Sequence, residues 1–209
     1  MPVGPHAGTH FVALLRDVRA ELGQEHRYAH CVRVARLAGR LAQRHGEEPE
    51  RARLAGLLHD LARLYDNERL LRECEARGFS IEPFERRYPI VLHARLSAEL
   101  ARERFGVEDS GILSAIRAHT LGAPHMSRLD AIVYLADGLE PGRAFAERRA
   151  LEALAFSDWE AAMGAVLRAS VAYLRGRNLE AAPATLAALA SFEGVSAAAA
   201  RNERRPLPA

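Results

Sequence analysis

Apolar residues recur at the spacing of an α-helix along almost the whole chain, and this periodicity constrains the fold more than any other feature. The first run of this kind consists of Phe11, Leu14, Leu15, Val18 and Leu22. No segment shows the alternation of apolar and polar residues that is typical of a half-buried strand. Pro49 suits the start of a helix, Gly106 suits the end of one, and residues 78–89, with two prolines, predict a loop. The sequence therefore predicts an all-α protein, a single bundle of roughly eight to ten helices.

Length and composition indicate one domain. The chain has 209 residues, and single domains commonly contain about 100–200. We expect residues 1–190 to form this domain and residues 191–209 to form a mobile tail, because the end of the chain is rich in alanine and poor in large apolar side chains. No apolar run approaches the ~20 residues that a membrane helix needs, and the N-terminus lacks the pattern of a secretory signal. These features predict a cytoplasmic protein without membrane association.

The charged residues and cysteines exclude several kinds of chemistry. All 29 basic residues are arginine, so Schiff-base catalysis and the lysine of a phosphate-binding P-loop are excluded. The 27 acidic residues leave a formal net charge of only +2, which argues against binding to long nucleic acids. The cysteines, Cys31 and Cys74, are too few for a disulfide framework and are not spaced as a metal-binding or redox pair.

Two ionisable residues, His59 and Asp60, lie side by side within the apolar segment AGLLHDLAR. We expect this segment to form the middle of a long helix. Burying a carboxylate and an imidazole among leucines costs several kcal/mol unless each group is hydrogen-bonded, paired or bound to a metal. Taken alone, the dipeptide is weak evidence for a metal site, because it is better explained by a core histidine with a carboxylate partner.

Four further residues with metal-binding side chains stand at the edges of apolar segments. His30 lies in YAHCVRVARLA, His93 follows IVL, His119 ends ILSAIRAHT and Asp137 lies in IVYLADGLE. With the His–Asp dipeptide, they supply four imidazoles and two carboxylates. These donors suit iron, manganese, zinc, cobalt or nickel, and the lack of thiolates argues against a structural zinc site. The pattern predicts a metal centre with room for two ions.

The order and the amino-acid sequences of these motifs resemble those of the HD-domain phosphohydrolases. More specifically, the chain resembles the YqeK-type symmetrical bis(5′-nucleosyl)-tetraphosphatases, which hydrolyse diadenosine tetraphosphate. The sequence segments on which this resemblance rests are HCVRVARLAGRLA, AGLLHDLAR, YPIVLHARLSAEL, FGVEDSGILSAIRAHTLG and MSRLDAIVYLADGLEPGRAF. They span residues 28–145, and six ligand positions in the same order make the match specific.

The resemblance implies two adjacent metal ions per chain, divalent or of mixed valence. One ion would be held by His30, His59, Asp60 and Asp137, and the other by His93 and His119, with Asp60 as the bridge. Iron is the metal usually described for the family, while manganese, cobalt, nickel and zinc also suit the donors. A metal-bound hydroxide would attack an inner phosphorus and cut diadenosine tetraphosphate into two ADP molecules.

Residues close to these motifs are expected to contact the substrate. They are Arg63, Thr120, His125, Arg128 and Arg143. Arg63 stands where the family often has a lysine, and it joins His59 and Asp60 as an expected catalytic residue. After His119 this chain reads HTLGA where the family usually reads HTTGR, so Leu121 and Ala123 remove a hydroxyl and a guanidinium from this region.

Other functions remain open on the sequence alone. The same ligands would serve hydrolysis of a deoxynucleoside triphosphate, a guanosine polyphosphate or a cyclic nucleotide, and a di-iron oxygenase would use a similar donor set. A helical module that binds a nucleotide or a protein without catalysis is the alternative of another class, although it predicts lost ligands and all six are present. The sequence leaves the base preference of the enzyme open, and it does not distinguish a monomer from a homodimer.

Overall fold

A computed structural model describes residues 6–203, and within this range the chain forms helices and no strand. The α-helices are α1 (His6–Leu22), α2 (Glu25–His45), α3 (Pro49–Leu58), α4 (Asn67–Ala76), α5 (Pro83–Arg87), α6 (His93–Phe105), α7 (Ser110–Ala118), α8 (Arg128–Leu139), α9 (Arg148–Ser157), α10 (Trp159–Gly176) and α11 (Pro183–Glu203), and a 3₁₀ helix, η1, spans Pro89–Leu92. The predicted all-α class is confirmed. None of the helices in residues 6–203 is both long and apolar enough to cross a membrane.

The described range holds eleven α-helices, one more than the upper end of the prediction. Part of the difference in helix number arises in residues 78–89. This segment was predicted to form a loop, but it contains α5 and the start of η1. Pro83 begins α5, where a fixed φ favours the first helical turn. A helix of five residues is too short to show a 3.6-residue periodicity, so the sequence pattern could not reveal it.

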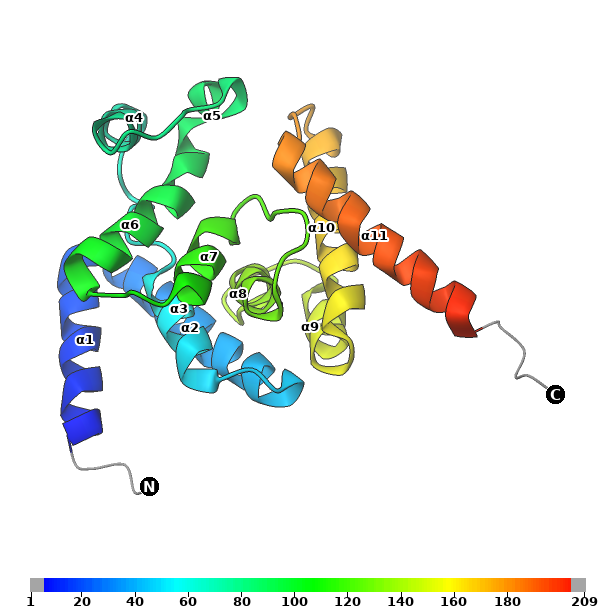
Figure 1. Ribbon diagram of the computed structural model, residues 1–209, viewed down its shortest axis with the longest axis horizontal. Coiled ribbons are helices and arrows are strands. Elements are labelled where there is room, and N and C mark those ends of the chain that lie inside the picture. Colours follow the sequence, from blue (N-terminus) through cyan, green and yellow to red (C-terminus); the bar gives the residue numbers. More distant parts are fainter. Residues whose placement is uncertain (1–5, 204–209) are drawn as a thin grey trace.

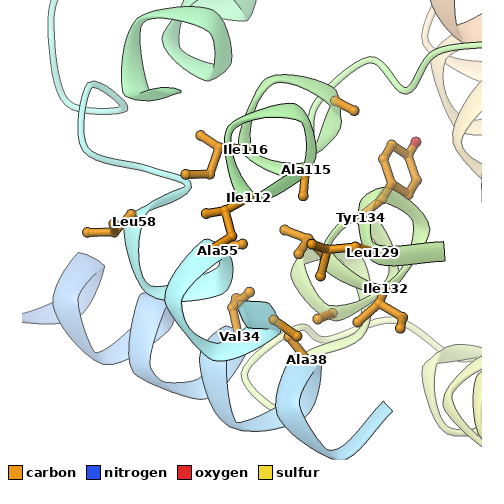
Figure 2. Close-up of a cluster of buried hydrophobic side chains, with 14 of the residues drawn as sticks. Val34, Ala38, Ala55, Leu58, Ile112, Ala115, Ile116, Leu129, Ile132 and Tyr134 are labelled. Carbon is orange, nitrogen blue, oxygen red and sulfur yellow. The ribbon is translucent and has the colours of Figure 1, made fainter. Parts of the chain in front are cut away.

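Four helices, α2, α3, α7 and α8, build the centre of the molecule (Figure 1). Their inward side chains form the cluster drawn in Figure 2, where the labelled residues are Val34, Ala38, Ala55, Leu58, Ile112, Ala115, Ile116, Leu129, Ile132 and Tyr134. Helices α9, α10 and α11 pack on the α8 side of this centre, while α4, α6 and η1 pack together on the other side. The site described below lies where the central helices end.

A close approach between α2 and α3 depends on Gly56. A Cβ atom built on this glycine would lie 3.0 Å from the Cα atom of Ala35 and 3.1 Å from its nitrogen. The missing side chain therefore lets the two helices approach at backbone distance. This contact brings the C-terminal end of α3 beside His30 on α2.

The C-terminal helix α11 packs on α10. Phe192 of α11 is buried, and its ring meets that of Trp159 edge to face with a centroid distance of 6.2 Å. The domain boundary that we expected near residue 190 thus falls inside α11, which continues to Glu203. The remainder of the expected tail, residues 204–209, lies outside the described range.

Replacing Phe192 with alanine is expected to lower the free energy of unfolding by about 3 kcal/mol, because truncating a buried aromatic side chain typically costs about 3–5 kcal/mol. Leu186, on the same helix but 41% exposed, offers a matched control. Its change to alanine should cost less than about 1 kcal/mol. Urea unfolding followed by circular dichroism measures both variants, and equal losses would show that the end of α11 does not belong to the packed domain.

Candidate active site

The six candidate ligands converge at the ends of helices that are distant in sequence. His30 lies on α2, His93 begins α6, and Asp137 lies in the last turn of α8. His59 and His119 are the residues that directly follow α3 and α7. All four histidines and Asp60 are buried, while the side chain of Asp137 is 20% exposed. The structure thus brings together every residue of the predicted donor set.

Asp60 lies between two groups of ligands, and each of its carboxylate oxygens faces one group. Its Oδ2 atom lies 3.4 Å from His59 Nε2 and 3.7 Å from His30 Nε2. Its Oδ1 atom lies 3.2 Å from His93 Nε2 and 3.7 Å from His119 Nε2. The carboxylate therefore has the placement of a bridge between two neighbouring positions.

Asp137 completes the first group. Its Oδ1 atom lies 3.1 Å from His30 Nε2 and 3.8 Å from His59 Nε2. The two imidazoles of this group face each other, with their Nε2 atoms 3.3 Å apart. In the second group the Nε2 atoms of His93 and His119 are 3.1 Å apart. Each group can thus offer several donor atoms to one point in space.

The prediction that His59 and Asp60 lie in the middle of a long helix is wrong. Helix α3 ends at Leu58, and residues 59–64 form turns held by hydrogen bonds from Leu61 N to the Leu58 carbonyl and from Arg63 N to the Asp60 carbonyl. Adjacent residues within a continuous helix point about 100° apart. Ending the helix at Leu58 lets His59 and Asp60 turn toward the same cluster.

Three of the histidines are oriented by the helix that precedes them. The Nδ1 atoms of His59, His93 and His119 lie 2.7, 2.5 and 2.7 Å from the carbonyl oxygens of Gly56, Ile90 and Ile116 respectively. A carbonyl can only accept, so each Nδ1 carries the proton and donates it. In the neutral imidazole, Nε2 then keeps a free lone pair aimed into the cluster, which is the form of histidine that binds a metal.

His30 is oriented differently, by a carboxylate. Its Nδ1 atom lies 3.1 Å from Oε1 of Glu140, which is buried at 2% exposure. Arg33 Nε donates to Glu140 Oε2 at 2.6 Å, and the Gly142 N–H donates to the same oxygen at 2.5 Å. Burial by itself would raise the pKa of Glu140, but these hydrogen bonds outweigh it and lower the pKa to about 2. The charged Glu140 carboxylate thus accepts from His30 Nδ1 and orients Nε2 of His30 toward the cluster.

The protonation of the cluster favours a bound cation. Burial, together with the neighbouring His59 and His93, lowers the pKa of His119 to about 3, so its imidazole is neutral at physiological pH. Burial opposes the charge on Asp60, yet His59 and His93 hold the pKa of this carboxyl well below its usual range. The Nε2 atoms of His93 and His119 face each other at 3.1 Å, and two nitrogen lone pairs at this distance repel unless a positive ion lies between them. The residues present therefore fit a metal centre.

Two arginines make ion pairs with the carboxylates of the cluster. Arg27 Nη1 lies 2.7 Å from Asp60 Oδ2, and Arg143 Nη2 lies 2.5 Å from Asp137 Oδ1. The Nε atom of Arg27 is buried without a partner in the described part of the chain. Arg143 was expected at the site from the sequence, whereas Arg27 and Glu140 were not. Arg27 lies three residues before His30 on α2, and Glu140 lies three residues after Asp137, directly after the end of α8. This spacing of three residues from a candidate ligand is the signal that could have found them.

A cavity of about 340 Å³ opens over the cluster. Its lining includes Asp60, His93, His119 and Asp137, surrounded by Arg27, Arg63, Thr120 and Arg143. The hydroxyl of Thr120 lies 2.9 Å from His119 Nε2 and 3.2 Å from His93 Nε2. Three of the five expected substrate contacts, Arg63, Thr120 and Arg143, are thus at the cavity.

The other two expected substrate contacts lie elsewhere. Arg128 begins α8, and Asp137 lies nine residues later, about 13 Å along the helix axis. The guanidinium of Arg128 instead donates to the carbonyl of His45 at 2.9 Å, at the C-terminal end of α2. His125 is exposed, does not line the cavity, and its backbone N–H donates to the hydroxyl of Ser191. Closeness in sequence to the motifs did not bring these two residues to the site.

Comparison with known proteins agrees with this geometry. The model of the HD domain family matches residues 27–142, more than half of the chain. The chain belongs to the HD domain family. All six candidate ligands of this HD domain, and also Arg27 and Glu140, fall inside the matched range.

Two curated relatives and one solved structure extend the comparison. The HD domain is 35% identical over 163 residues to a protein of Halalkalibacterium halodurans named symmetrical bis(5′-nucleosyl)-tetraphosphatase, with 78% of this chain and 87% of that protein covered. A Bacillus subtilis protein of the same name is 34% identical over 161 residues, with 77% and 86% covered. A crystal structure from Clostridium acetobutylicum, of an HD superfamily hydrolase described as involved in NAD metabolism, has a TM-score of 0.84 and 30% identity, covering 88% of this chain and 97% of that one.

The role of Glu140 can be tested by changing its charge while keeping its shape. Glu140→Gln is expected to weaken the binding of the first Mn²⁺ ion by about tenfold, because outer partners of metal-binding histidines typically contribute about 10–100-fold to affinity. Calorimetric titration of the metal-free protein measures this. The same change at Glu99, Glu99→Gln, is the matched control and should leave Mn²⁺ affinity unchanged. Glu99 is also buried and paired with arginines, Arg102 and Arg117, but lies outside the cluster. Equal Mn²⁺ affinity in wild type and Glu140→Gln would show that Glu140 only supports the fold.

Proposed function

We propose that this HD domain is a metal-dependent phosphohydrolase that cuts diadenosine tetraphosphate symmetrically into two ADP molecules. One observation carries the proposal: the two oxygens of Asp60 face two separate groups of imidazoles, as a carboxylate between two metal ions would. The substrate is suggested by the relatives named symmetrical bis(5′-nucleosyl)-tetraphosphatase, which match this chain over most of its length.

Two ions would be held by two sets of residues that share Asp60. His30, His59 and Asp137 would hold one ion, and His93 and His119 the other. The imidazole and carboxylate donors suit iron, with manganese, cobalt, nickel and zinc as alternatives. When bound, such ions supply Lewis acidity and lower the pKa of a coordinated water toward ~7, which provides a nucleophile at neutral pH.

The arginines of the cavity would bind the polyphosphate. Arg27, Arg63 and Arg143 line the cavity above the cluster, and their charges offset those of the phosphoryl oxygens. Arginine suits this role because its planar fork donates two parallel hydrogen bonds to one phosphate group. Thr120, whose hydroxyl lies beside His93 and His119, is in reach to donate to an oxygen on that side.

The reaction would need no general acid from the protein. A cut between the two central phosphates releases ADP, whose terminal phosphate has a pKa near ~6 and can leave as an anion at neutral pH. This agrees with the cavity, whose imidazoles and carboxylates are all candidate ligands. The other titratable groups of its lining are arginines and Tyr134, and burial raises the pKa of Tyr134 to about 12. The ion pair from Arg27 helps to keep Asp60 ionised.

Product analysis tests the proposed reaction directly. The protein loaded with Mn²⁺ or Fe²⁺ is expected to convert diadenosine tetraphosphate into ADP alone, with one labelled oxygen in one of the two products when the solvent is heavy-oxygen water. Asp60→Ala should lower kcat/KM by more than about 100-fold, because it removes a ligand shared by both groups. Asp17→Ala, at an exposed aspartate outside the cluster, should leave the rate unchanged.

Two results would contradict the proposed reaction. AMP and ATP as first products would contradict the symmetrical cut. The substrate would be wrong, but the metal site still supported, if the same assay showed faster hydrolysis of a deoxynucleoside triphosphate, a guanosine polyphosphate or a cyclic nucleotide.

A further inference from the structure

A second cavity, of about 470 Å³, lies between α5 and the start of α11. Its apolar lining consists of Pro83, Phe84, Leu121, Ala182, Pro183 and Ala184. The volume falls within the range of about 300–1,000 Å³ that is common for ligand sites. Four charged residues, Glu82, Glu85, Arg87 and Glu180, complete the lining of the second cavity. The first cavity differs in having imidazoles and several arginines around its carboxylates.

The same two segments of the chain contribute residues to both cavities. Thr120 lines the first cavity and Leu121, the next residue, lines the second, so their Cα atoms are about 3.8 Å apart. On the opposite wall, Arg87 lines the second cavity and Ile90, three residues later, lines the first. A ligand that has its phosphates at the metal cluster therefore has an apolar cavity directly beside it.

We propose that this second cavity binds one nucleoside end of the substrate. The inference rests on the proposed function, because it takes the polyphosphate of the same substrate to lie over the metal cluster. A nucleotide joins a highly charged chain to a flat aromatic base, and the charged and apolar cavities match these two parts. The aromatic ring of Phe84 supplies a surface on which a purine stacks.

The wall that carries Leu121 is held in place before any ligand binds. The hydroxyl of Thr185, which is buried, donates to the Leu121 carbonyl at 2.8 Å and ties the segment after α7 to the first turn of α11. At Gly122, a Cβ atom would lie 3.1 Å from the Cβ of Ala188, so the backbone packs closely on α11. A preformed wall lowers the entropy that a bound base must lose.

The opposite wall is ordered by aromatic packing. The Phe84 ring lies against Tyr88, with a centroid distance of 4.8 Å. At the rim, the exposed guanidinium of Arg87 pairs with Glu180 at 3.2 Å, across the gap between α5 and the segment before α11. An exposed pair of this kind contributes little to stability, so it yields readily to an entering ligand.

One apolar side chain on this wall is that of Leu121. It is half-buried and lines the second cavity. Leu121 thus places apolar surface beside the expected base. It therefore favours contact with an aromatic face over a hydrogen bond at this point.

Binding measurements with two probes separate the nucleoside from the phosphates. Metal-loaded protein is titrated with ADP and with inorganic pyrophosphate by calorimetry. Phe84→Ala is expected to weaken ADP binding by about tenfold, the size of one lost base–aromatic contact, and to leave pyrophosphate binding unchanged. Ala184→Trp, which fills the cavity from the α11 side, should act in the same direction even if Phe84→Ala folds poorly. Tyr173→Ala, an exposed aromatic residue of α10 outside both cavities, is the control.

The outcomes distinguish this inference from the proposed function. The nucleoside site would be overturned if both variants bound ADP with unchanged affinity, or if they lost as much affinity for pyrophosphate as for ADP. It would also be overturned if the wild type did not bind ADP. Each of these results would count against the site even with diadenosine tetraphosphate hydrolysed normally. The expected ADP pattern in a protein that does not hydrolyse diadenosine tetraphosphate would support the nucleoside site and reject the substrate.

Discussion

The buried carboxylate of Asp60 is the constraint around which the site is arranged. An ionised carboxylate inside a helical bundle is strongly disfavoured unless it is paired or bound to a cation. Here imidazoles from two ligand groups lie within 3.7 Å of its two oxygens, and Arg27 donates to one of them. The helices that bring these groups together, α2, α3, α6 and α7, must all reach the same point, which fixes their relative positions.

The ends of the helices and the ligands of the site are linked by one hydrogen-bond pattern. The last carbonyls of a helix lack partners inside the helix. His59 and His119 directly follow α3 and α7, and each satisfies such a carbonyl through Nδ1 while presenting Nε2 to the cluster. The C-terminal ends of helices also carry partial negative charge, which favours a cation nearby. The same residues thus complete the helices and prepare a site for metal ions.

The sequence revealed the six candidate ligands because each interrupts an apolar segment, where an ionisable side chain is costly. It could not reveal Arg27 in the same way, because one arginine among 29 on amphipathic helices carries no such signal. Glu140 lies beyond the last apolar residue of α8, and its burial depends on Arg33 from a helix more than 100 residues away in sequence. Arg128 was expected at the site, but most of the length of helix α8 separates it from Asp137. Local sequence context therefore predicts the buried ligands, whereas their outer partners depend on how distant helices pack.

Anomalous diffraction from crystals grown with Mn²⁺ tests most directly whether Asp60 bridges two metal ions. Two anomalous peaks about 3.5–4 Å apart are expected, one on each side of the Asp60 carboxylate. One peak should lie among His30, His59 and Asp137, and the other between His93 and His119. The bridging role of Asp60 would be contradicted by a single peak with Asp60 paired only with Arg27. It would also be contradicted by two peaks that do not both lie beside an oxygen of Asp60.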